Sequence, residues 1–172
     1  RNEQGTVIYR YAVEPFKQVE VAFSGDRVTS IVVQLAKVFP AKLVAEQLQL
    51  TNIRPVLVSN ELGDILGQSY PERGVLFPFE QNQKPGVPSM QVTEIVLEPV
   101  GPDPFLLRAE TNLQSNFKQN LRDLDEAIKL APDLGRAHWL RSRVLAAMGR
   151  VDEAVEASRR AVALEQNNAR YR

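Results

Sequence analysis

Two segments of this chain carry nearly the same sequence: VTSIVVQ at positions 28–34 and VTEIVLE at positions 92–98, an offset of 64. The similarity continues upstream, where PFKQVEVAFS (15–24) aligns with PERGVLFPFE (71–80) at an offset of 56. Strings of valine and isoleucine recur by chance in β-rich sequences, and this alternative stays open. The proline that opens both upstream segments favours a duplicated structural unit instead.

The similarity also continues downstream, where FPAKLVAEQL (39–48) aligns with DPFLLRAETN (103–112) and both contain an Ala-Glu pair. The offset grows from 56 to 64 because the short turn at 24–27 in the first copy corresponds to a longer loop at 81–91 in the second. Each copy therefore predicts three strands followed by one helix, and the two copies together predict an antiparallel α+β domain over residues 1–100.

Local patterns support the strands. Val19, Val21 and Phe23 alternate with other residues, which is the period of a strand with one buried face. The opening strands are expected at 5–12 (GTVIYRYA) and 64–70 (DILGQSY), and Ser24-Gly25-Asp26 is typical of a hairpin turn. The segment PVLVSNELGD (55–64) has no aligned partner, so it is either an extra hairpin arm or the second copy of a segment that precedes Arg1.

After residue 100 the apolar residues follow the period of a helix. Two stripes with spacings near three and four are present: Phe117, Leu121, Leu124 and Ile128, then Val151, Val155, Ser158 and Val162. The second stripe lies in AHWLRSRVLAAMGRVDEAVEASRRAVALEQNNA (137–169), which resembles a tetratricopeptide repeat, with small residues at the positions where that motif packs its helices. Residues 101–172 are therefore expected to form helical hairpins.

The resemblance covers about residues 102–170, in two repeats. The first repeat departs from the motif, because Arg108 and Asn120 stand where small residues are usual. The β-rich half resembles, in pattern only, the small-protein-A/β-lactamase-inhibitor-like module of bacterial envelopes, and no functional residue is transferred from it.

The tetratricopeptide resemblance implies a groove lined by the first helix of each repeat, where a partner peptide or helix binds. The candidate partner-binding residues on this basis are Arg136, Trp139, Arg143, Ala146, Phe105 and Asn112. Tryptophan and arginine are frequent anchors of protein interfaces, although Trp139 packing on a neighbouring helix is an equally simple interpretation.

Composition argues against most other classes. With 21 basic and 21 acidic residues, the chain lacks the excess of positive charge that nucleic-acid binding favours. It has no cysteine and a single histidine, His138, so we expect no catalytic residues, no metal site and no cofactor. No apolar run reaches the length of a membrane span.

These observations predict a non-enzymatic protein–protein interaction module, or scaffold, that is a fragment of a larger, bacterial tetratricopeptide-repeat protein. In the alternative, the β-rich domain binds the ligand, as an envelope-assembly or inhibitor-like domain, and the helices act as a spacer. The exposed loops expected at 71–74 and 81–91 would then carry recognition.

Overall fold

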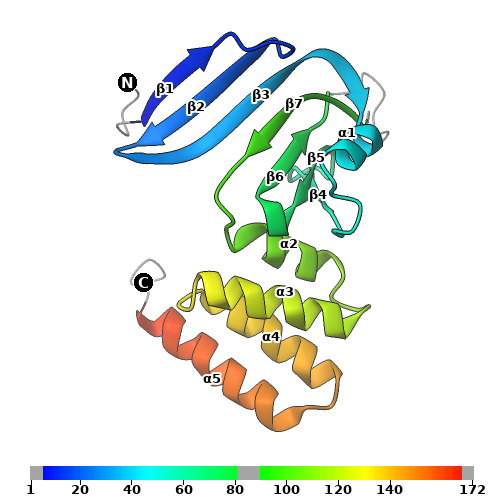
Figure 1. The fold of residues 1–172 in the computed structure, drawn as a ribbon. Coiled ribbons are helices and arrows are strands. Elements are labelled where there is room, and N and C mark those ends of the chain that lie inside the picture. Colours follow the sequence, from blue (N-terminus) through cyan, green and yellow to red (C-terminus); the bar gives the residue numbers. More distant parts are fainter. Residues whose placement is uncertain (1–5, 81–89, 168–172) are drawn as a thin grey trace. The chain divides into compact units, whose positions relative to one another are not determined.

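The computed structural model describes residues 6–80 and 90–167 and combines one antiparallel sheet with helices, which confirms the α+β class (Figure 1). The chain divides into two compact units at the boundary between Val100 and Gly101. Each unit has its own hydrophobic core.

The first unit contains a seven-stranded sheet with strand order β1-β2-β3-β7-β6-β5-β4, in which all neighbouring strands are antiparallel. The elements are β1 (Thr6–Tyr11), β2 (Gln18–Ser24), β3 (Arg27–Pro40), α1 (Ala41–Gln47), β4 (Val56–Ser59), β5 (Ile65–Tyr70), a 3₁₀ turn (Pro71–Arg73), β6 (Val75–Pro78) and β7 (Gln91–Leu97). The segment 55–64 contributes β4, an additional arm that pairs with β5 at one edge of the sheet.

The aligned sequence positions take the same pairings in the two halves of the sheet. The pairs are Val19–Val33, Glu20–Val32 and Phe23–Val28 in the first half, and Val75–Leu97, Leu76–Val96 and Phe79–Val92 at the aligned positions of the second. Where the halves meet, Val32 lies opposite Val96, its own aligned counterpart. From the central β3–β7 pair outward, the strand order is β3-β2-β1 on one side and β7-β6-β5 on the other, with β4 added beyond β5.

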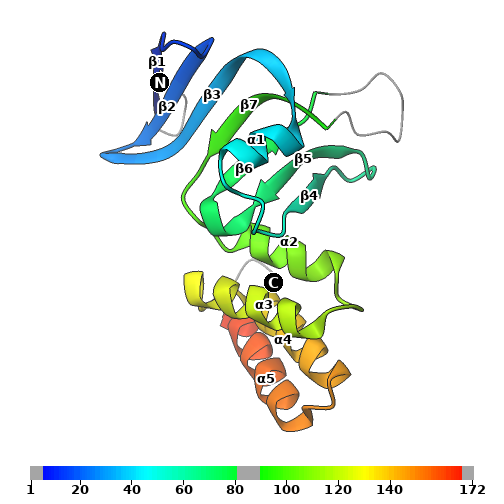
Figure 2. The ribbon, with the colours of Figure 1, turned by 45° about the vertical axis from the view of Figure 1, so that its right-hand side comes forward.

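The core of the first unit is confined to one part of the sheet. Ala41, Val44 and Ala45 of α1 are buried together with residues of β5, β6 and β7, and α1 lies against β3 and β7 (Figures 1 and 2). Between residues 6 and 40 no residue is buried, although this segment contains three strands. The two halves therefore share the same strand pairing, but only the second half has a buried core beneath α1.

The second unit consists of four consecutive helices: α2 (Asp103–Thr111), α3 (Phe117–Leu130), α4 (Gly135–Ala147) and α5 (Val151–Asn167). Each helix packs on the next along the chain. Gly149 ends α4 with a φ of 75°, a conformation that glycine adopts without strain, and this allows the chain to turn directly into α5.

A buried polar cluster joins α2 to α3. Arg108 Nε donates to Asp123 Oδ2 at 3.0 Å, and Arg108 Nη2 donates to Asp123 Oδ1 at 2.7 Å. Gln119 Nε2 also donates to Asp123 Oδ1 at 3.1 Å, and the Arg108 guanidinium lies 5.6 Å from the centre of the Phe105 ring. Both partners of the ion pair are about 1% exposed.

Asn120 is the second polar residue of this hairpin interior. Its Nδ2 donates to the backbone oxygens of Asn112 at 2.6 Å and Ser115 at 2.9 Å, which holds the turn between α2 and α3. Arg108 and Asn120 are the two residues that depart from the small-residue pattern in the sequence. Both side chains donate hydrogen bonds inside the hairpin, Arg108 to Asp123 and Asn120 through its Nδ2, whereas the buried Asn120 Oδ1 has no hydrogen-bond partner.

Candidate interaction site

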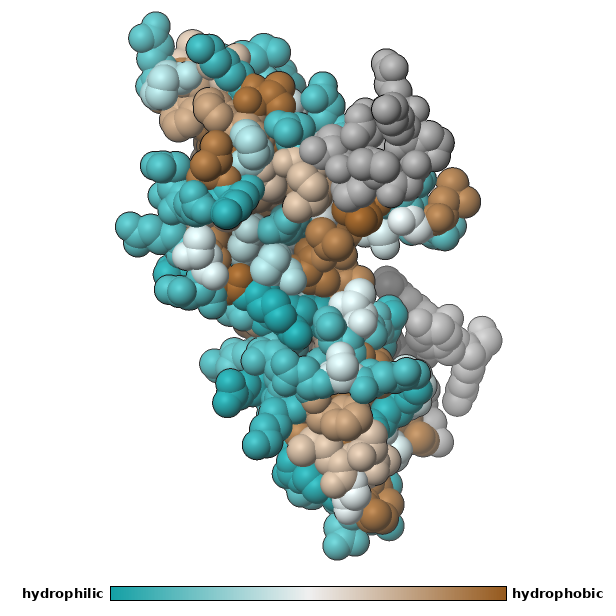
Figure 3. Space-filling view, turned by 90° about the vertical axis from the view of Figure 1, so that its right-hand side faces the viewer, coloured by the Kyte–Doolittle hydropathy of each residue, from teal (hydrophilic) through white to brown (hydrophobic). Residues whose placement is uncertain are grey.

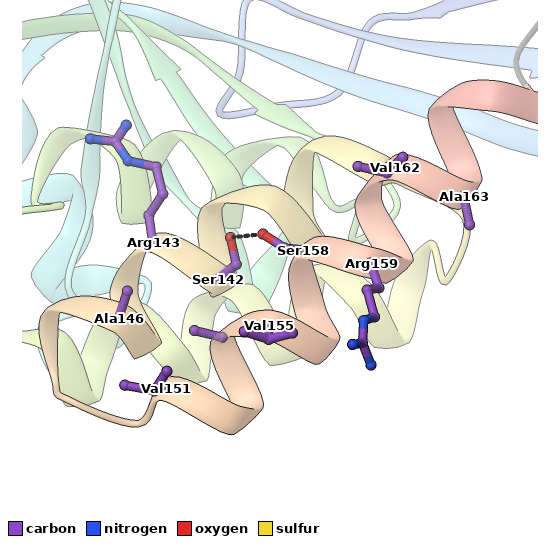
Figure 4. A pocket seen from close by; sticks show the side chains of 10 residues that line it. Ser142, Arg143, Ala146, Val151, Val155, Ser158, Arg159, Val162 and Ala163 are labelled. Carbon is purple, nitrogen blue, oxygen red and sulfur yellow. Dashed lines mark hydrogen bonds between the residues drawn. The ribbon is translucent and has the colours of Figure 1, made fainter.

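An open apolar groove runs along α4 and α5. Its volume is about 670 Å³, and its lining residues are Ser142, Arg143, Ala146, Val151, Ala154, Val155, Ser158, Arg159, Val162 and Ala163 (Figure 4). Val151, Val155 and Val162 are exposed, so this groove presents valine side chains to solvent. Exposed apolar grooves with a polar border are typical of interaction sites.

The groove follows from the sequence of α5. Its alanines at 154, 157 and 161 are buried, and Ala154 and Ala157 belong to a core that includes residues of α4, on which α5 packs. The valine stripe of α5 lies on another face and is left uncovered. Ser158 Oγ donates to Ser142 Oγ at 3.3 Å and bridges the two helices within the groove (Figure 4).

The α5 side of the groove aligns with a surface that is occupied elsewhere in the same unit. At a constant offset of 34, the stripe Val151, Val155, Ser158 and Val162 aligns with Phe117, Leu121, Leu124 and Ile128 of α3. Those α3 residues belong to the helical core, where α4 packs on α3 and supplies Ala137, Leu140 and Val144. The groove on α4 and α5 is thus the counterpart of a face that accepts a helix.

The charge at the border of the groove differs from that of its counterpart. Arg141 Nε of α4 donates to Asp125 Oδ1 of α3 at 2.8 Å. At the same offset Asp125 aligns with Arg159, which borders the groove. The groove therefore has a basic side chain at the position where α3 has an acidic one. Arg143 is the second arginine of the lining, and within the described residues no carboxylate forms an ion pair with it.

The first turn of α5 is fixed next to the groove. Arg150 donates to both carboxylate oxygens of Glu153, at 2.7 and 2.6 Å. These hydrogen bonds lower the pKa of the Glu153 carboxyl below its usual value. The acidic side chains Asp152 and Glu153 also lie at the positive end of the helix dipole.

Two of the residues predicted as partner-binding, Arg143 and Ala146, line the groove. Trp139 is exposed one helical turn away, and the Arg143 guanidinium lies 5.0 Å from the centre of its ring, so the two side chains form one exposed unit. Arg136 is exposed and pairs with Glu110 at 2.7 Å.

The remaining two predicted residues serve the interior of the unit. Phe105 is only 3% exposed and belongs to the helical core. Asn112 is half-buried, and its Nδ2 donates to the backbone oxygen of Arg108 at 3.0 Å. Val151, Val155 and Val162 were not among the predicted site residues, although their spacing indicates one face of a helix.

Residues 6–80 and 90–167 contain no group of three or more acidic, histidine or cysteine side chains that could hold a metal ion. The single histidine, His138, has its Nε2 2.9 Å from the backbone oxygen of Pro132. Among these residues no helix has both the length and the apolar character needed to cross a membrane.

The loops of the alternative hypothesis lie in the first unit. Residues 71–73 form the 3₁₀ turn, in which Pro71 is buried and Glu72 and Arg73 are exposed. Most of the loop expected at 81–91 lies outside the described residues, which end at Glu80 and resume at Met90.

Comparison with known proteins gives no assignment. No family model, no curated protein and no solved structure matches this chain.

Proposed function

We propose that the helical unit is a protein-interaction module without catalytic activity, composed of two tetratricopeptide repeats, and that its partner is an amphipathic helix bound in the α4–α5 groove. The observation that carries this proposal is the exposed valine stripe of α5, which aligns with the stripe of α3 that α4 covers. We also propose that the sheet arose by duplication, which the matching registers of its two halves support.

The helix α4 indicates the sequence that the groove accepts. α4 buries Ala137, Leu140 and Val144, spaced by three and four residues, and directs Arg141 at Asp125. Because Arg159 replaces the acidic residue at the groove, the partner helix carries Asp or Glu where α4 carries Arg141. Arg143 favours a second acidic residue in the same partner.

A peptide copy of α4 provides the test. The probe is residues 135–147 with Arg141→Glu, hydrocarbon-stapled through positions 139 and 143, because a helix of this length is marginal on its own. Fluorescence anisotropy measures its binding to the chain, and the same peptide with Arg141 retained is the comparison. We expect the glutamate peptide to bind more tightly by about threefold or more, since one exposed charge pair contributes ~0.2–1 kcal/mol and the arginine peptide is repelled as well.

Two matched variants of the chain locate the binding. Val155 and Leu130 are almost equally exposed, at 44% and 41%, but only Val155 lines the groove. Val155→Gln should weaken binding by about 1–2 kcal/mol, because a polar amide replaces apolar area at the contact, and Leu130→Gln should leave it unchanged. Absence of saturable binding, or equal effects of the two variants, would refute the proposal.

A further inference from the structure

The strands β1, β2 and β3 present a continuous apolar face. Residues that pair directly across antiparallel strands lie on the same side of a sheet. The cross-strand rows Val7–Phe23–Val28, Tyr9–Val21–Ile31 and Tyr11–Val19–Val33 therefore place nine apolar side chains on one face. Tyr9 and Phe23 are in edge-to-face contact there, with ring centres 5.6 Å apart.

The opposite face of the same strands is mainly polar. Arg10 Nε donates to Glu20 Oε1 at 2.9 Å, and Gln18 Nε2 donates to the same oxygen at 2.6 Å. An antiparallel sheet with one apolar and one polar face normally packs its apolar face against another layer. The alternation of apolar and polar residues along these strands therefore identifies the face that is expected to pack against another layer.

The second half of the sheet shows what that cover is. The aligned positions Val75, Phe77, Phe79, Val92 and Ile95 are all buried, and so is Tyr70, which pairs with Val75 as Tyr11 pairs with Val19. They share a core cluster with Ala41, Val44 and Ala45 of α1, so a short helix with small apolar residues at spacings of three and one covers this face. The same kind of sheet face thus accepts a helix in one half of the unit.

The first half has such cover only at its border with the second: Val33 of β3 packs against the α1 cluster, whereas no described residue of β1 or β2 belongs to that cluster. In residues 6–80 and 90–100 the helical segments are α1 and the 3₁₀ turn, and α1 packs in the core of the second half (Figures 1 and 2). Tyr9, Tyr11 and Val28 are each about half exposed. Figure 3 shows one side of the molecule, on which hydrophobic side chains lie at the surface among hydrophilic ones.

We propose that the apolar face of β1–β3 is a second docking site, and that its occupant is a short amphipathic helix of a partner protein, with a buried stripe of small and branched apolar residues like that of α1. This site is separate from the α4–α5 groove and does not depend on it. It would make the strand unit an interaction domain in its own right.

The size of the face favours a helix over a second copy of the chain. Three strands about 4.8 Å apart and five residues long cover roughly 14 by 17 Å, or about 240 Å². A stable protein interface buries about 800 Å² on each partner, roughly three times this footprint, so the face suits a weak contact with a short helix rather than a stable dimer. Two to three turns of a helix, about 10 Å wide, match this footprint.

The probe for this site is the α1 segment itself. A peptide of residues 39–53, hydrocarbon-stapled between the exposed positions 42 and 46, is titrated into the ¹⁵N-labelled chain, and amide shifts are followed by NMR. We expect saturable shifts in β1–β3, and no such shifts with the same peptide carrying Val44→Asp. Shifts confined to β5–β7, or no shifts at all, would overturn the proposal.

Two neighbouring residues provide matched variants. Tyr9 and Ile8 are 52% and 46% exposed and lie on opposite faces of β1. Tyr9→Thr should weaken peptide binding by about fivefold or more, because aromatic residues are frequent interface anchors, and Ile8→Thr should not. Equal effects would contradict the assignment of the face.

Sedimentation velocity tests the competing occupant. We expect the chain to remain monomeric at this face up to the concentrations of the NMR sample. A concentration-dependent dimer that Tyr9→Thr dissociates and Ile8→Thr does not would assign the face to a second copy and would overturn the proposed partner helix.

Discussion

The buried ion pair of the α2–α3 hairpin makes the helical unit sensitive to one substitution, Asp123→Ala. The Asp123 carboxylate accepts two hydrogen bonds from Arg108 and one from Gln119, and both members of the pair are about 1% exposed. Removing the carboxylate takes two charge-assisted hydrogen bonds from a guanidinium in the interior, and removing one member of a buried ion pair costs about 3–5 kcal/mol. A unit of this size has a total stability of only about 4–11 kcal/mol.

The single tryptophan makes this loss measurable in the helical unit of the intact chain. Trp139 lies on α4, so urea unfolding followed by its fluorescence reports on the helical unit. Asp123→Ala should lower the free energy of unfolding by about 3–5 kcal/mol. The double substitution Arg108→Met with Asp123→Leu should recover most of this loss, because apolar residues of similar volume replace a buried ion pair at little cost.

Two results would refute this reasoning. A loss below about 1 kcal/mol for Asp123→Ala would mean that the pair behaves like an exposed salt bridge. A double variant as unstable as the single one would mean that the shape of the two side chains, and not their charge, supports the hairpin.

Three further predictions concern other buried features. Asn120→Ala should cost about 1–3 kcal/mol in the same fluorescence assay, because the backbone oxygens of Asn112 and Ser115 lose their shared donor; a loss within error would contradict this. Gly74→Ala should lower the free energy of unfolding measured by circular dichroism by about 2–3 kcal/mol, since Gly74 has a φ of 59° and its added methyl would meet the backbone oxygen of Glu98, whereas Gly63→Ala, at a φ of 87° in open space, should cost only about 1 kcal/mol. Burial raises the pKa of Tyr70 above its usual 10.0, although a hydrogen bond with Gln68 opposes this. Above pH 10 the unfolded chain therefore loses the Tyr70 proton while the folded chain keeps it, so stability should fall as pH rises, and Tyr70→Phe should flatten that part of the curve in pH-dependent urea titrations; an unchanged slope would contradict it.

The sequence predicted the α+β class and the strands well because alternation and helical spacing depend only on neighbours along the chain. The strands expected at 5–12 and 64–70 are β1 and β5, within one residue at each end. The residues 55–64 were left open between two interpretations, and they contribute β4 at a sheet edge. For β1 and β5 the pattern of the segment itself was sufficient to predict its conformation.

The sequence was less informative about which apolar face is covered. The stripes of α3 and α5 look alike along the chain, yet the first is part of the core and the second is exposed, because burial of α3 depends on a following helix. The same holds for Val21 and its aligned residue Phe77, since only the latter lies beneath α1. The element that covers an apolar face comes from another part of the fold. The spacing of apolar residues within one segment therefore does not predict whether that face is buried.

Phe105 illustrates a third limit. It was predicted at the partner-binding face by its alignment with Trp139, but it is buried below the guanidinium of Arg108. The partner of that guanidinium, Asp123, lies on the next helix and reads in the sequence as an ordinary polar helix residue. A buried ion pair of this kind becomes visible only when the two helices are placed together.

The central claim is that the α4–α5 groove accepts a helix, and methyl NMR of the valine-labelled chain tests it most directly. On addition of the stapled α4 peptide that carries Arg141→Glu, the methyl signals of Val151, Val155 and Val162 should shift and saturate together, while that of the buried Val144 should move least. Unchanged signals from the three groove valines at saturating peptide, or shifts located only in the strand unit, would contradict the claim.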